Sequence, residues 1–237
     1  MKKFLTIFCS LFAVTIINLD IAAAAKPVMA VAEFTSVRNW TWWRTGVGGD
    51  LSDMLTTELA ATGGFRMVER SRLRYVQREL ALQQSGQVSR RTRAKIGRLT
   101  GAKYIVLGKV SAFEQNVNST GGGFRYKRFK FGGKSKKAYI AIDLRVVNVQ
   151  TGVIEHVRTV EARSSSSGVR FGLSKRYFSG GLSSQKKTPV GKAIRGVIIE
   201  ATDYLQCVMV DKDDCIGEFR AKEKKRRRGS RGSIKLD

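Results

Sequence analysis

The side chains that carry out catalysis in most enzymes form no recognisable set in this chain. His156 is the only histidine, and it lies in an alternating strand pattern, where a structural role is expected rather than metal ligation or general-base catalysis. The sequence shows no Ser/His/Asp or Cys/His set, and the glycines at 121–123 lack the strand-to-helix context of a phosphate-binding loop. We therefore expect no enzymatic activity, no metal and no cofactor.

Two cysteines toward the C-terminal end are candidates for a disulfide. Cys207 and Cys215 flank a turn-like segment, residues 211–214, with the sequence DKDD. A bridge between them would close this loop in an oxidising compartment, whereas the alternative is two unpaired thiols. The turn-like loop favours the bridge.

The N-terminal segment predicts export from the cytoplasm. Lys2 and Lys3 precede an apolar run over residues 4–17, and four alanines follow at 22–25. This is the pattern of a signal peptide, and the run is shorter than the roughly 20 apolar residues that a membrane-spanning helix needs. We expect residues 1–25 to be removed, so that the mature chain begins near Lys26.

Positive charge is concentrated in two parts of the sequence. The chain has 44 Lys and Arg against 19 Asp and Glu, a formal net charge of +25. Residues 120–187 hold 15 of the basic residues and residues 220–237 hold nine. Such basicity is typical of nucleic-acid binding, but an exported protein would instead meet anionic lipid, lipopolysaccharide or acidic proteins. We expect the basic tail, 216–237, to be disordered and solvated, with anchoring to an anionic surface as the alternative.

An α/β pattern of alternating strands and helices accounts for the body of the chain. Apolar periodicity predicts strands over 28–34, 65–69 and 104–113 and a hairpin around residues 150–152; helices are expected over 50–62, 71–84, 90–99 and from 188 onward. In the second of these helices the inward-facing residues would be Leu73, Val76 and Leu80. The fold expected is an α/β sandwich, with helices packed on a small sheet.

Several segments resemble the curli-secretion channel family, the CsgG-like proteins. The resemblance rests on residues 31–34 (VAEF), 54–59 (MLTTEL), 101–108 (GAKYIVLG) and above all 144–152 (LRVVNVQTG), and it covers about 28–205. It implies an outer-membrane channel built as a homo-oligomeric ring, in which each subunit has a periplasmic domain over 26–215 and two β-hairpins that complete a shared transmembrane barrel. Its partners would be an exported, unfolded, curli-like protein and accessory periplasmic factors, and no nucleic acid.

The resemblance locates the two hairpins at 114–140 and 158–187. A barrel strand alternates lipid-facing and lumen-facing side chains, and parts of both segments follow this alternation. The predicted lipid-facing residues are Phe124, Tyr126, Val169, Phe171 and Leu173, and the predicted lumen-facing residues are Arg125, Lys127 and Arg170. Soluble polar loops are the alternative for both segments.

Residues 35–49, which we call the tryptophan loop, contain all three tryptophans. In the resembled family this loop narrows the channel. That position would place Trp42 and Trp43 at the narrowest point, where Arg38 and Arg44 would favour acidic segments of the exported chain. The alternative is that the indoles pack over the edge of the sheet.

Two departures from the family keep a second function open. The chain has no cysteine at the predicted cleavage point, although characterised members of this family are lipoproteins, and its arms are more basic than a typical lipid-facing band. The alternative function is a periplasmic envelope-assembly or surface-binding protein that uses the same α/β domain without forming a pore.

Overall fold

A computed structural model describes residues 25–38, 40, 42–70, 72–95, 97–115, 137–165, 168–170 and 188–233. Its centre is a seven-stranded sheet in the order β3-β1-β4-β5-β6-β7, with β2 paired to β4. The strands are β1 (Val28–Val31), β2 (Thr35–Ser36), β3 (Arg66–Met67), β4 (Tyr104–Gln115), β5 (Lys137–Asn148), β6 (Ile154–Ser165) and β7 (Gly168–Arg170). The helices are α1 (Val47–Ala61), α2 (Leu73–Gln84), α3 (Pro189–Gln206), the π-helical η2 (Cys207–Asp211) and α4 (Cys215–Ser233). The predicted mixed α/β fold is confirmed.

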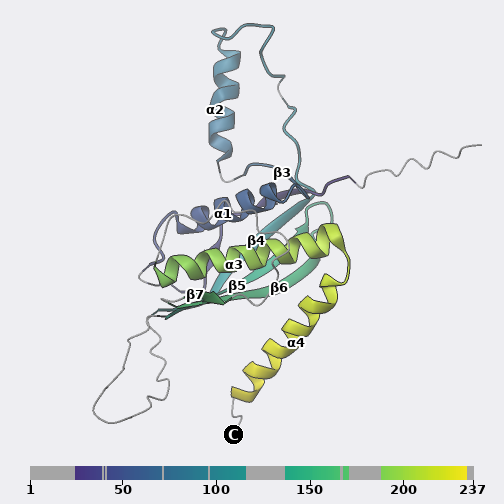
Figure 1. Cartoon of the computed structure of the whole chain (residues 1–237). Helices are drawn as coiled ribbons and strands as arrows, with labels where there is room; N and C mark the ends of the chain where they lie inside the picture. The colour runs from purple at the N-terminus through teal and green to yellow at the C-terminus, as the bar shows by residue number, and fades with distance from the viewer. Residues whose placement is uncertain are drawn as a thin grey trace, which may run out of the picture.

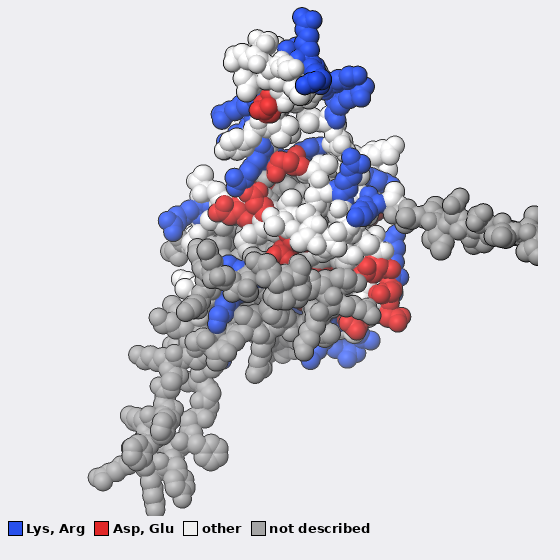
Figure 2. Space-filling view, turned by 45° about the horizontal axis from the view of Figure 1, so that its top comes forward, with Lys and Arg blue, Asp and Glu red and all other residues white. Residues whose placement is uncertain are grey.

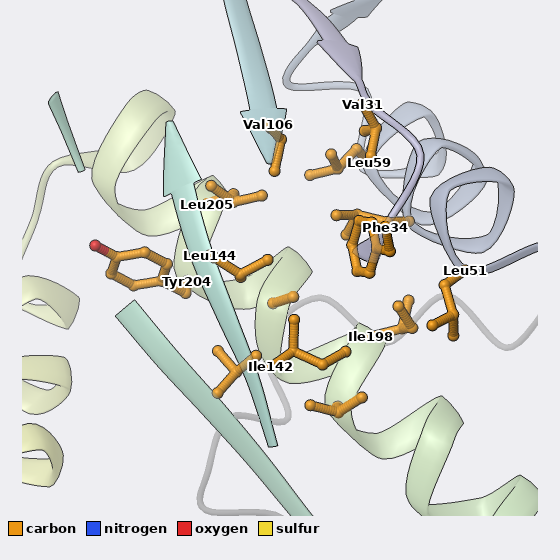
Figure 3. Close-up of a cluster of buried hydrophobic side chains, with 14 of the residues drawn as sticks. Val31, Phe34, Leu51, Leu59, Val106, Ile142, Leu144, Ile198, Tyr204 and Leu205 are labelled. Carbon is orange, nitrogen blue, oxygen red and sulfur yellow. The ribbon is translucent and has the colours of Figure 1, made fainter. Parts of the chain in front are cut away.

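Helices α1 and α3 lie together on one face of the sheet (Figure 1). Their buried side chains meet the inward-facing side chains of β5, which follow the period of two that the sequence predicts. The core between them includes Leu55. It also includes Leu51, Leu59, Ile142, Leu144, Ile198 and Leu205 (Figure 3). Each such side chain stabilises the fold by about 1.5 to 3 kcal/mol relative to leaving it exposed.

The N-terminus of α3 follows the capping chemistry that its sequence predicts. The Thr188 hydroxyl accepts a hydrogen bond from the Gly191 N–H at 3.2 Å, and Pro189 occupies the first turn. A threonine cap satisfies one of the free N–H groups of the first turn. Proline costs no hydrogen bond at this position, because a backbone N–H in the first turn has no acceptor within the helix. The helix therefore begins at the predicted residue.

The segment from 71 to 100 differs from the prediction. Helix α2 forms, but none of its residues is buried, and it projects from the body of the molecule (Figure 1). Its apolar face is therefore half-buried rather than part of the core. The helix predicted over 90–99 is wrong, because the described residues there are turns and irregular chain, with Gly97 at φ 76°. Figure 2 shows Lys and Arg side chains gathered around this projecting segment.

The prediction of a disordered tail over 216–237 is also wrong. Residues up to Ser233 form α4, and only 234–237 lie outside the described residues. Phe219 is buried against Tyr204 of α3, with 5.4 Å between ring centroids. The Lys222 Nζ also lies 3.0 Å from the Glu200 carboxylate. The ring contact and the ion pair hold α4 against α3, and the run of charged residues alone does not predict either contact.

The predicted disulfide is confirmed. Cys207 and Cys215 are bonded, and they are eight positions apart in the sequence. The bond joins η2, which continues α3, to the first residue of α4. It therefore fixes the turn from which α4 departs.

Phe34 holds the two ends of the tryptophan loop together. Its backbone N–H donates to the Gly48 carbonyl at 3.1 Å, and a Cβ added at Gly48 would lie 2.2 Å from the Phe34 carbonyl oxygen. Its ring lies against Gly108 of β4, where an added Cβ would meet the ring at 2.5 Å. Glycine at 48 and 108 is required because no side chain fits either contact.

We predict that Gly48→Ala lowers the free energy of unfolding by about 1 to 3 kcal/mol, the usual cost of overpacking. Gly49 is the matched control in the same helix, because a Cβ added there meets nothing within 4 Å. Gly49→Ala should stabilise the fold by about 0.5 to 1 kcal/mol, because alanine is the better helix former. Urea unfolding measures both. Equal effects would contradict the close contact between Gly48 and Phe34.

We predict that Cys215→Ser lowers the free energy of unfolding by roughly 2 to 3 kcal/mol, the loop entropy of a bridge of this length. Reductant should destabilise the wild-type chain by the same amount in urea unfolding. The Cys215→Ser variant serves as control, since reductant should leave its unfolding curve unchanged. A wild-type curve that does not respond to reductant would show that the bridge adds no stability.

Candidate functional site

Both predicted hairpin segments reach the same end of the sheet. Strand β5 is antiparallel to β4 and to β6, and the pairs Gln115↔Ala138, Lys137↔Ser165 and Ser165↔Gly168 are in register. The chain therefore leaves β4, enters β5, leaves β6 and enters β7 at neighbouring positions, which we call the arm end. The Ser164 hydroxyl donates to the Pro189 carbonyl, so the start of α3 lies at the arm end too (Figure 1).

The described parts of the hairpin segments are strands. Residues 114–115 and 137–140 belong to β4 and β5, residues 158–165 belong to β6, and Val169 and Arg170 belong to β7. The other predicted lipid-facing and lumen-facing residues lie outside the described residues: Phe124, Arg125, Tyr126, Lys127, Phe171 and Leu173. The assignment of each side chain to lipid or lumen stays a prediction.

The tryptophan loop lies against β4 close to the arm end. Strand β2 pairs with β4 through Thr35↔Lys109 and Ser36↔Val110, which sets the direction of the loop. The Trp42 ring then packs on Phe113 with 4.5 Å between centroids. Phe113 is two residues from the point where the chain leaves β4, so this contact places the loop beside the first hairpin segment.

The three indoles form one aromatic cluster. Trp40 stacks on Trp42 at 6.2 Å, and Trp43 meets Trp42 edge-on at 5.5 Å. All three are half-buried against the core, as the packing alternative expects. The enclosed Nε1 of Trp42 has no hydrogen-bond acceptor among the described residues. A buried donor without an acceptor is uncommon and costs about 1 to 3 kcal/mol.

The two arginines of the loop are exposed. Arg38 follows β2, and Arg44 precedes α1. Arg44 and Trp43 line an open pocket of about 820 Å³ together with Glu33 and residues 34–36. Two of the predicted loop residues, Trp43 and Arg44, thus lie at the pocket. The indole of Trp42 lies further in and packs on the sheet.

Sequence reasoning missed Phe113 as the residue that positions the loop. A strict period of two would put Phe113 on the face opposite Val110. A bulge between Val110 and Ala112 shifts the register, so that Phe113 pairs with the buried Ile140 and lies on the covered face. The sequence contains no residue type that announces this bulge.

No helix within the described ranges combines the length and apolar character needed to cross a membrane. Among the same residues, one cluster has the composition of a metal site, Cys207, Asp213 and Cys215. Its two sulfurs are bonded to each other and are therefore not available as thiolate ligands.

Solved structures resemble the fold only distantly. The hypothetical protein CT253 from Chlamydia trachomatis matches at 13% identity and a TM-score of 0.44, over 77% of this chain and 97% of that one. The PelC dodecamer from Paraburkholderia phytofirmans matches at 13% identity and a TM-score of 0.32, over 73% and 85%. Likeness at this level adds nothing to the assignment below.

Sequence comparison is more specific. The curli production assembly/transport component CsgG of Escherichia coli K12 is 35% identical over 114 residues, which are 46% of this chain and 41% of that protein. The protein of the same name from Salmonella typhimurium matches with the same identity and coverage. These alignments span less than half the length of the curated relatives. The family model described as curli production assembly/transport component CsgG matches residues 13–233, which include α4. The chain belongs to the CsgG family.

Proposed function

We propose that this chain is one subunit of an outer-membrane secretion channel that exports unfolded, curli-like protein through a homo-oligomeric pore. The convergence at the arm end carries the proposal. Both hairpin segments reach this end of the sheet, and the Trp42–Phe113 contact holds the tryptophan loop beside the first of them. A channel subunit needs this arrangement, because its constriction must lie where the barrel meets the periplasmic domain.

The lengths of the two segments suit membrane hairpins. Twenty-one residues separate Gln115 from Lys137, and 17 separate Arg170 from Thr188. A barrel strand needs about 9 to 11 residues, so the first segment has room for two strands and a short turn. The second segment is long enough for two strands and a turn when residues of β6 and β7 are counted with it. The edge strands of a hairpin have unpaired backbone N–H and C=O groups, and lipid offers these groups no hydrogen-bond partner. Strand pairing between subunits in a closed ring removes the open edges.

The tryptophan loop would form the constriction. In a ring, each subunit contributes Trp43 and Arg44 to a collar around the pore, while Trp42 anchors them to β4. Aromatic rings grip apolar segments of an unfolded chain, and the arginines, including Arg38, favour acidic ones. The proposal includes export by the signal peptide and assigns the chain no catalytic role.

We predict that Trp43→Ala raises the single-channel conductance of the purified oligomer in planar bilayers, because it removes a ring from the narrowest point. Trp42→Ala should raise the conductance too, and it should also lower the free energy of unfolding by about 3 to 5 kcal/mol if the site cannot collapse. Tyr75→Ala is the control, since Tyr75 is an exposed aromatic on the projecting helix α2. It should change neither quantity.

Two outcomes oppose this proposal. An oligomer that conducts ions but shows unchanged conductance in Trp43→Ala would make the loop a structural element only. A chain that is folded, present in the envelope and unable to conduct in any oligomeric form would favour the periplasmic assembly factor without a pore.

A further inference from the structure

A second candidate site lies away from the arm end, between α4 and the first half of β6. It is a cleft of about 610 Å³, and we call it the basic cleft. Six of its lining residues are Lys or Arg, and one is acidic, Glu223. Its volume is in the range of ligand pockets, which run from about 300 to 1,000 Å³. The secretion function proposed above makes no use of it.

Arg158 forms the inner wall of the basic cleft. Its guanidinium lies over the rings of Phe219 at 4.8 Å and Tyr204 at 5.2 Å, and its Nη1 donates to the Phe219 carbonyl at 2.7 Å. Its enclosed Nε has no acceptor among the described residues. Burial lowers the pKa of Arg158, but arginine stays charged at any physiological pH. Arg158 is thus a fixed cation in the lining of the cleft.

The opposite wall is a stripe of cations along α4. The lining residues Arg220, Lys224, Arg227, Arg228 and Arg231 recur at the three- and four-residue spacing of one helical face. Glu223 is held by Arg226 and Arg227 at 2.8 and 2.7 Å, and these hydrogen bonds lower its pKa to about 2. Within the described part of the chain, the other four cations of the stripe have no carboxylate within 4 Å.

Apart from His156, the remainder of the lining is apolar or aromatic. Val157 of β6 lines the cleft and is 62% exposed, and Val208 and Ile216 lie beside it. An isolated inorganic anion would gain nothing from this surface. An anionic group attached to hydrocarbon would contact both the cationic and the apolar lining, because its charge would meet the arginines and its carbon atoms would cover Val157.

We propose that the basic cleft binds the headgroup of one anionic phospholipid together with the first carbons of its chains. Arginine favours phosphate, since its planar fork donates two parallel hydrogen bonds to phosphate oxygens. The stripe is exposed, but it borders the same cleft as Arg158 and Val157, and the size of this cleft suits one headgroup, so the lipid is taken as an individual molecule at the periplasmic domain.

The test compares two lysines that are adjacent in sequence. Lys224 lines the basic cleft and Lys225 does not, although both are exposed on α4 and carry the same charge. Native mass spectrometry of the delipidated full chain, titrated with dihexanoyl phosphatidylglycerol, gives the Kd of each variant. We expect Lys224→Gln to raise the Kd about three- to tenfold, the effect of one charge-assisted hydrogen bond at a partly exposed site. Lys225→Gln should change it less than twofold.

Further arms identify the ligand. Glycerol 3-phosphate and dihexanoyl phosphatidylcholine should bind at least tenfold more weakly than the anionic lipid, and Val157→Thr should weaken only the lipid. Circular dichroism and unfolding curves verify that each variant is folded. Equal losses for Lys224→Gln and Lys225→Gln would overturn the proposal in favour of diffuse electrostatics. Equal binding of glycerol 3-phosphate would overturn the lipid assignment, and so would displacement of the lipid by a glutamate-rich peptide at lower concentration.

Discussion

The antiparallel register of β4, β5 and β6 is the constraint on which the rest of the structure depends. Each of these strands has 12 residues, and their pairing brings the ends of both hairpin segments to neighbouring positions. A shift by one residue would turn every buried side chain of β5 to the opposite face. The core beneath α1 and α3 therefore fixes the register, and the register fixes where the hairpin segments leave the domain.

Much of this arrangement is predictable from the sequence, because strong periodicity and capping residues report local structure. The strand alternation of β5, the capped start of α3 at Thr188 and the bond between Cys207 and Cys215 are found as expected. The bulge beside Phe113, the exposure of α2 and the docking of α4 are not predictable in this way. Each depends on which distant surface is available to cover a side chain, and local pattern carries no such information.

The two ends of the sheet differ in chemistry in a way that suits separate tasks. At the arm end, aromatic rings packed on β4 place Trp43 and Arg44 at an open pocket. Away from it, the buried ring of Phe219 holds α4 against α3, and an exposed row of cations on α4 borders the basic cleft. The disulfide and the Lys222–Glu200 pair keep that row in place. Export and lipid binding would then involve surfaces that share no residue.

The central claim is that the arm end continues into a membrane barrel shared by several subunits. Electron microscopy of the native protein, extracted from outer membranes in mild detergent, tests this most directly. The account predicts closed rings with a central pore, in which the barrel emerges from the arm end and the tryptophan loop lies at its base. A strictly monomeric particle across several mild detergents, or a ring whose subunits meet without a barrel, would contradict it.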